Sequence, residues 1–219
     1  STEIGTDDAI TTYTATFYDD ADRVVRTANY GTNQSGFEAD GSAPSPSQSS
    51  PPASSDTILV SKRTYNVRGL VKTTTDPGGD QTKYIYDDMN RKIGVVENFD
   101  DATLSWSDSL TPSRWDEGNV SQSDADNGKD RVTSYVYDGI GNILVQTAHQ
   151  PSNDEVTEYA YGVASGSASN DDDSLLASND LLSEVVYPDS SGGTDTVTHA
   201  YTRLGEMRFM EDQNETEHV

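Results

Sequence analysis

A short aromatic pattern recurs along this chain and constrains its fold more than any other feature. The clearest copies, which place a β-forming or aromatic residue at alternate positions, are 82–87, 133–138, 157–162 and 197–202. Alternate residues of a strand point to the same face of a sheet, so this spacing is typical of strands. Looser copies lie at 14–19 and 62–66. Such self-similarity indicates repeated units that stack on their neighbours.

A turn-forming residue follows the copies at a fixed distance. The residues found four positions after the last tyrosine of a copy are Asp22, Gly69, Asn90, Gly141 and Gly205. Gly, Asn and Asp tolerate the left-handed backbone on which hairpin loops of three to five residues commonly end. Short β-rich runs follow, at 93–96 and 143–145 for example. The pattern therefore predicts a strand, a tight turn and a returning strand, which is a β-hairpin.

Turns of a second kind join the hairpins. Asp76-Pro77-Gly78-Gly79 lies between copies ending at Tyr65 and Tyr86, which are 21 residues apart. Proline presets one turn dihedral and glycine supplies the other. Segments 188–193 and 212–215 occupy equivalent places. We therefore expect an all-β fold with almost no helix, in which consecutive hairpins form one antiparallel strip.

These residues resemble the YD-repeat, or Rhs-repeat, family, whose pattern is roughly Tyr-x-Tyr-Asp-x-x-Gly-Arg-Leu. Residues 84–91 match with Asn90 in place of the glycine, and residues 135–142 match with Asn142 in place of the arginine. The resemblance implies a structural repeat motif made of Tyr18, Asp19, Arg23, Tyr65, Gly69, Tyr84, Tyr86, Asp87, Asn90, Arg91, Tyr135, Tyr137, Asp138, Gly141, Tyr159, Tyr161, Tyr201 and Gly205.

The same resemblance carries expectations about the whole protein. It implies a piece of a larger strip that, in bacterial toxin-complex shells and teneurins, winds into a hollow cocoon. The implied partners are neighbouring YD repeats of the parent chain, with glycans or an enclosed cargo domain as further candidates, at an extracellular or cell-surface location. A short stack of repeats cannot cover its own ends, which also favours a fragment. We expect one YD-repeat segment over 1–219.

Three insertions interrupt the predicted repeats, at about 31–56, 100–127 and 163–180. The first is rich in Ser and Pro, and the third contains three consecutive aspartates at 171–173. Both are poor in apolar residues, so we expect mobile surface loops. The insertion at 100–127 differs because it holds the large apolar residues Leu104, Trp106, Leu110 and Trp115. We expect that segment to pack on the strip as an extra lobe.

Composition excludes several classes of function. Lys and Arg number 14 against 38 Asp and Glu, a formal net charge of −24. Such a surface repels phosphate backbones and anionic bilayers, so we expect no nucleic-acid partner. No apolar run approaches the roughly 18–20 residues that span a bilayer, so we expect no membrane insertion. The absence of cysteine excludes disulfides and thiolate metal sites.

The acidic residues offer only weak candidate sites. The pairs Asp19-Asp20, Asp87-Asp88 and Asp100-Asp101 suggest the two carboxyl groups of a glycoside hydrolase. Two of these pairs begin predicted turns, however, where aspartate accepts backbone N–H bonds. Segment 124–130 departs from a calcium-binding loop because it lacks the glycine at the sixth position and the glutamate at the twelfth. We therefore expect a structural role for these carboxylates.

The remaining candidates are no stronger. His149, His199 and His218 are isolated in sequence, and His199 takes the place of a repeat tyrosine, which favours packing over metal ligation. No Gly-x-Ser-x-Gly elbow precedes a predicted helix. We expect no catalytic residue, cofactor or metal. The favoured function is non-enzymatic, as a structural segment of a shell or stalk, with toxin encapsulation as its most specific form. The alternative is an adhesin-like module that binds carbohydrate or protein through exposed tyrosines or through Trp106 and Trp115.

Overall fold

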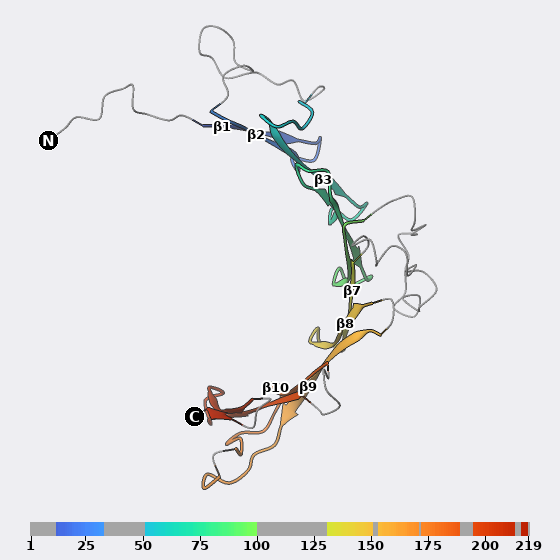
Figure 1. The fold of residues 1–219 in the computed structure, drawn as a ribbon. Coiled ribbons are helices and arrows are strands. Elements are labelled where there is room, and N and C mark those ends of the chain that lie inside the picture. The colour runs from blue at the N-terminus through green and yellow to red at the C-terminus, as the bar shows by residue number, and fades with distance from the viewer. Residues whose placement is uncertain are drawn as a thin grey trace, which may run out of the picture. The chain divides into compact units, whose positions relative to one another are not determined.

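The computed structural model describes residues 12–32, 51–99, 131–150, 153–170, 172–188, 195–212 and 216–218. Within these ranges the regular structure consists of thirteen strands and no helix (Figure 1). No described segment is therefore a helix long and apolar enough to cross a membrane. The predicted all-β fold is confirmed.

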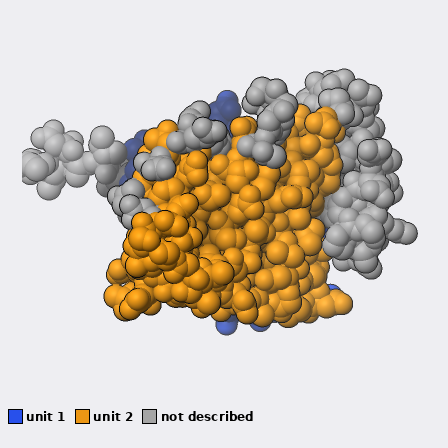
Figure 2. Space-filling model, turned by 90° about the horizontal axis from the view of Figure 1, so that it is seen from below, with its two compact units in different colours: residues 1–85, 96–103 blue, residues 86–95, 104–219 orange. Residues whose placement is uncertain are grey.

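The chain divides into two compact units, which are coloured separately in Figure 2. The first unit comprises residues 1–85 and 96–103, and the second comprises residues 86–95 and 104–219. The strands of the first unit are β1 (Tyr13–Tyr18), β2 (Val24–Gly31), β3 (Leu59–Tyr65), β4 (Val71–Thr75) and β5 (Gln81–Tyr86), of which only Tyr86 falls in the second.

The second unit contains eight strands, and the last two residues of one of them, β6, fall in the first unit. They are β6 (Lys92–Glu97), β7 (Arg131–Tyr137), β8 (Ile143–His149), β9 (Glu155–Val163), β10 (Ser178–Tyr187), β11 (Asp195–Tyr201), β12 (Met207–Glu211) and β13 (Glu217–His218). Within each unit the strand order is the order of the chain. Strand pairs such as β1–β2 and β7–β8 are antiparallel, as predicted for successive hairpins.

A register shift occupies the same place in four hairpins. It falls immediately before the tyrosine that ends the outgoing strand, at Phe17/Tyr18, Thr64/Tyr65, Val136/Tyr137 and Ala200/Tyr201. A bulge inserts one extra residue, increases the local twist and redirects the side chain that follows it. Because the bulge recurs at a fixed position, these tyrosines leave their strands in equivalent settings.

The first unit has a well-defined buried cluster. Phe17, Ala28, Tyr30 and Val60, none more than 4% exposed, form it from three adjacent strands. The pairing of Ala28 with both Ala15 and Val60 places these residues in one row across the sheet. Full burial of a large apolar side chain contributes about 1.5–3 kcal/mol, so a few such rows can stabilise a chain that is poor in apolar residues.

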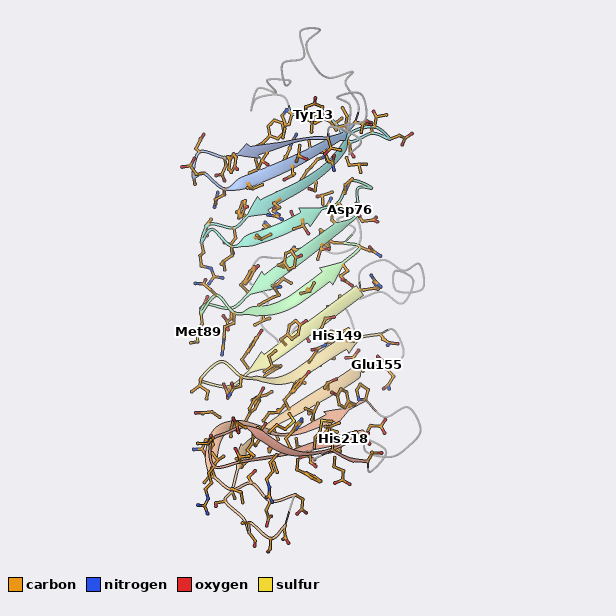
Figure 3. All side chains as sticks on the ribbon, turned by 90° about the vertical axis from the view of Figure 1, so that its left-hand side faces the viewer. Tyr13, Asp76, Met89, His149, Glu155 and His218 are labelled. Atoms are coloured by element: carbon orange, nitrogen blue, oxygen red, sulfur yellow. The ribbon has the colours of Figure 1, made fainter. Side chains whose placement is uncertain are left out.

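The hairpin turns and the joining turns lie at opposite ends of the strands. In the second unit Met89, in the turn between β5 and β6, lies on one side of the sheet, and His149 and Glu155 lie on the other (Figure 3). The joining turn predicted at Asp76 is confirmed in the first unit, where Gly79 N donates to Asp76 O over 3.1 Å. Within each unit we call the strand ends that carry the turns after these tyrosines the tyrosine side; the tyrosines are Tyr18 and Tyr65 in the first unit and Tyr86, Tyr137 and Tyr201 in the second.

Hydrogen bonds connect the described residues of the loop between β9 and β10, where we expect a mobile loop, to neighbouring strands. Arg208 Nη1 on β12 donates to the carbonyl oxygens of Asn170 and Asp173, over 2.8 and 2.9 Å. Ser174 is buried, and its Oγ accepts a hydrogen bond from Tyr201 N over 3.1 Å. Contacts with β11 and β12 therefore hold this loop without an apolar core of its own. The predicted lobe at 100–127, with Trp106 and Trp115, lies outside the described residues, as do residues 33–50 of the first insertion.

Candidate functional site: the tyrosine–arginine tips

The turns on the tyrosine side share one hydrogen-bond pattern. The residue after the tyrosine donates its N–H to the carbonyl four positions on, as Asp87 N does to Arg91 O over 3.0 Å. Its side-chain oxygen then accepts the N–H groups inside the turn. The residues in this role are Asp19, Asn66, Asp87, Asp138 and Thr202. The predicted structural role of Asp19 and Asp87 thus has a geometric basis: each carboxylate satisfies the backbone of its own turn.

The residue four positions after the tyrosine has a positive φ in all five turns. The values are 57° at Asp22, 81° at Gly69, 65° at Asn90, 106° at Gly141 and 81° at Gly205. The two non-glycine values at 57° and 65° lie in the left-handed region that Asp and Asn tolerate, whereas 106° is a conformation for glycine. The sequence rule for the turn is therefore confirmed at each position that it named.

In two turns an arginine pairs with the aspartate of the same turn. Arg23 Nε and Arg91 Nε donate to the second carboxylate oxygen of Asp19 and Asp87, over 2.8 and 2.7 Å. Hydrogen bonds from Arg23 hold the pKa of the Asp19 carboxyl below its usual value. Burial of Asp87 favours its neutral form, but the hydrogen bonds from Arg91 outweigh that effect, and the pKa of Asp87 is also lowered.

The same arginines contact the tyrosine of the next hairpin on the tyrosine side. The guanidinium of Arg23 lies over the Tyr65 ring at 4.5 Å from its centroid, and that of Arg91 lies over the Tyr137 ring at 4.8 Å. Arg91 Nη1 also donates to Asp138 O over 2.7 Å. Each guanidinium thus bonds within its own turn and stacks on the neighbouring strand, a geometry that its planar fork allows and an ammonium does not.

The tyrosines return a hydrogen bond to the hairpin that supplies the arginine. The Tyr65 hydroxyl donates to Val24 O and the Tyr137 hydroxyl donates to Lys92 O, both over 2.7 Å. Val24 and Lys92 directly follow Arg23 and Arg91 in sequence. We call this pair of interactions, arginine over ring and hydroxyl to carbonyl, the tip contact. Burial raises the pKa of the Tyr137 hydroxyl, so it remains a donor at neutral pH.

The other motif residues depart from this arrangement. Asn142 replaces the arginine in the turn after Tyr137, and its Nδ2 donates to Asp138 Oδ2 over 3.0 Å, so the hydrogen bond within the turn remains without the cation. Tyr161 pairs with Leu182 across β9 and β10, and its turn is replaced by the loop already described. The Tyr201 hydroxyl donates to Leu182 O over 2.8 Å, which keeps the hydroxyl bond without an arginine.

Some motif tyrosines lie within their strands, away from the tips. Tyr84 Oη lies 3.5 Å from Thr74 Oγ1 on β4. Tyr135 pairs with Gln146, and Tyr159 pairs with Val185. Tyr137, two residues after Tyr135, differs from them because it lies at a tip and stacks on Arg91.

The three histidines have different surroundings. His218 Nε2 lies 3.3 Å from Asp212 Oδ2 in an exposed setting. His199 has a buried Nδ1 with no hydrogen-bond partner, and burial lowers the pKa of its ring. Both observations agree with the packing role expected for His199. His149 contacts two polar side chains that sequence reasoning did not associate with it, Ser134 and Asp154. Among the described residues no group of three potential ligands is placed to hold a metal ion.

Hairpins joined through recurring tip contacts define a β-hairpin repeat protein. The family model for the RHS Repeat matches residues 65–98, a segment that begins at one tip tyrosine and contains Asp87, Asn90 and Arg91. The resemblance to the YD/Rhs-repeat family is thereby confirmed, and the chain carries an RHS repeat at that segment. No curated protein matches the chain.

One solved structure extends the likeness in fold beyond that segment. The crystal structure of TcdB2-TccC3-TEV matches with a TM-score of 0.50 and 16% identity, over 89% of this chain and 7% of that one. The Photorhabdus luminescens Tc holotoxin pore with a mutated TccC3 matches with a TM-score of 0.35 and 13% identity, over 85% of this chain and 8% of that one. This chain therefore spans less than a tenth of each of these two proteins.

Proposed function

We propose that this chain is a structural, non-enzymatic segment of a large secreted or surface-displayed YD/Rhs-repeat protein, to whose shell or stalk it contributes hairpins. The observation that carries the proposal is the tip contact. At two junctions, Arg23 with Tyr65 and Arg91 with Tyr137, it joins one hairpin to a neighbouring one through one cation, one ring and one hydroxyl, so these groups serve contacts between hairpins. The short span relative to the TcdB2-TccC3-TEV structure supports membership of a longer chain.

The composition of the chain agrees with that role. A formal net charge of −24 keeps separate copies apart in solution, whereas contacts along a single chain are held by its covalent connection. The partners that we propose are the adjoining repeats of the parent chain. Enclosure of a cargo domain is the most specific form of the proposal, because the family resemblance implies a strip that winds around a hollow.

Electron microscopy of the intact parent protein tests this function. We expect the segment to form part of a continuous wall of hairpins, with successive tips in contact. A compact domain separated from any repeat wall would contradict the proposal. Replacement of Arg91 by alanine in the parent provides a second readout: protease cleavage should begin near residue 91, whereas the exposed Arg203 replaced by alanine should leave the cleavage pattern unchanged.

A binding module remains the second candidate, favoured by exposed side chains such as Tyr18 at 44% and Tyr187 at 40%. Such rings can stack on sugars. A glycan-array screen of the chain tests this candidate, with Tyr18→Ala and Tyr187→Ala as variants and Trp106→Ala with Trp115→Ala as a second pair. Specific binding that the variants abolish would establish the module. A blank array would leave the structural role as the better account.

A further inference from the structure

A three-residue polar network lies on the side of the second unit opposite the tips. His149 ends β8, and its Nε2 lies 2.8 Å from the Oγ of Ser134 on β7. The other ring nitrogen, Nδ1, lies 2.9 Å from Asp154 Oδ2, just before β9. Figure 3 shows His149 on the side of the sheet where Glu155, the residue after Asp154, also lies. The network takes no part in the tip contacts.

The strand register and one backbone bond hold the three groups in place. Val132 pairs with His149 and Ser134 pairs with Thr147, so the side chains of Ser134 and His149 point to one face of the sheet from diagonal positions. The remaining carboxylate oxygen, Asp154 Oδ1, accepts the N–H of Gln150 over 3.0 Å. The chain segment that follows His149 thus holds one oxygen of the carboxylate, and the other oxygen, Oδ2, faces the imidazole.

This order of groups gives the imidazole a defined role. A carboxylate can only accept, so Nδ1 carries the proton that it donates to Asp154. In the neutral ring Nε2 is then an acceptor, and it faces the Ser134 hydroxyl. A hydroxyl, a base within hydrogen-bond reach and a third group that orients the base are the features of an activated nucleophile.

We propose that Ser134 is a nucleophile toward small acyl esters and that the chain becomes acylated there. The Ser134 Oγ attacks the acyl carbon and forms a new O–C bond, while the bond from that carbon to the ester oxygen breaks. The hydroxyl proton passes to His149 Nε2 and from there to the departing alkoxide. The products are O-acyl-Ser134 and an alcohol. This modification site goes beyond the shell function and does not depend on it.

The burial of Ser134 and His149 determines which acyl donors can reach the serine hydroxyl. Ser134 is 9% exposed and the His149 side chain 11%, whereas the Asp154 side chain is 39% exposed, so the network opens toward solvent at its carboxylate end. Small, uncharged donors fit such an approach, and bulky or anionic donors do not, since Asp154 and the acidic surface repel the latter. Ser167, which is exposed and bonds to Ser169 Oγ over 2.7 Å, provides a matched comparison without a histidine beside it.

The test is covalent labelling of the whole chain with 4-nitrophenyl acetate and with a small alkyl fluorophosphonate, followed by intact mass and peptide mapping. We expect one adduct per chain, located on Ser134. Ser134→Ala should abolish the adduct, and His149→Gln should slow it by about 10²-fold, the lower limit for a general base. Asp154→Asn should slow it as well, and Ser167→Ala should leave the rate unchanged.

Circular dichroism and the urea midpoint of each variant establish that the sheet persists. Should His149→Gln disrupt folding, Asp154→Asn, which is nearly isosteric, supplies the decisive rate. Labelling at Ser134 that is equally fast in a folded His149 or Asp154 variant would overturn the proposal, as would an adduct spread over several surface residues. In either case the three side chains would serve only to connect β7, β8 and the segment before β9.

Discussion

A pair of glycines in one turn isolates the energetic cost of the backbone conformation that the repeat requires. Gly139 and Gly141 both lie between β7 and β8, and a Cβ added to either would meet no atom within 4 Å. They differ in dihedral angle: φ is 106° at Gly141, whereas Gly139 is not among the residues with positive φ. A valine Cβ therefore meets no clash at either position, and the comparison of the two variants tests backbone strain.

The magnitude follows from two opposing terms. An L-residue forced into the conformation of Gly141 costs about 1–3 kcal/mol. Loss of glycine also removes freedom from the unfolded chain and returns about 0.4–1 kcal/mol. The second term is common to both variants, so their difference gives the strain alone. We expect Gly141→Val to be less stable than Gly139→Val by about 1–3 kcal/mol.

Urea unfolding followed by circular dichroism measures this difference. With a slope of about 1–3 kcal/mol per molar urea, the midpoint of Gly141→Val should lie about 1 M below that of Gly139→Val. Equal midpoints would refute the reasoning, because they would mean that the turn adopts another conformation at no cost. A shared large decrease would show instead that side chains do contact the turn.

Three further predictions concern the tips, a partly buried histidine and the net charge. Arg91→Ala removes a partly exposed ion pair, a ring contact and a charge-assisted hydrogen bond, and should cost about 2 kcal/mol in urea unfolding, against less than about 0.5 kcal/mol for the exposed Arg203→Ala. Burial lowers the pKa of His199 in the folded chain, so the unfolded chain binds more protons. The free energy of unfolding should therefore fall as the pH drops below about 6.5. Thermal melts from pH 7 to 5 should show a smaller decrease in melting temperature for His199→Tyr than for the unchanged chain. A slope unchanged by that substitution would assign the effect to other groups. Because a net charge of −24 opposes association, light scattering should show particle size rising with salt and on acidification toward the sequence pI of about 4.1, and a constant size under both treatments would contradict this.

The turns were predictable from sequence because their causes are local. Asn90 and Gly141 stand four residues after a tyrosine, and the need for positive φ there depends only on the turn itself. The alternation that predicted the strands is local as well, since the face of the sheet to which a side chain points depends only on whether its position along the strand is odd or even. Local rules of this kind hold in any tertiary setting that keeps the hairpin.

The contacts between hairpins could be anticipated only in part. Arg91 belongs to the repeat pattern, but its stacking on Tyr137 joins residues separated by the long segment between β6 and β7. The network around His149 was missed because it joins side chains from β7, the end of β8 and the segment before β9, and the strand pattern does not show which polar side chains meet. The hydrogen bonds of Arg208 to the loop between β9 and β10 were not predicted, for a similar reason. The acceptors of these hydrogen bonds are backbone carbonyl groups, which are present at every residue, so composition does not indicate which of them an arginine will bind.

The position of the tip contacts bears on how such a chain can change in evolution. The turns that carry the tip contacts' arginines span only 19–23 and 87–91, whereas connections on the opposite side run to 32–58 and 98–130. An insertion at a tip would move an arginine away from its tyrosine, but an insertion on the far side leaves those distances intact. The long connection 164–177, also on the tyrosine side, has no such arginine, and Arg208 on β12 binds it instead through Asp173 O. We therefore expect related chains to keep the length of the turns that carry these arginines and to accept insertions at the other ends of the strands.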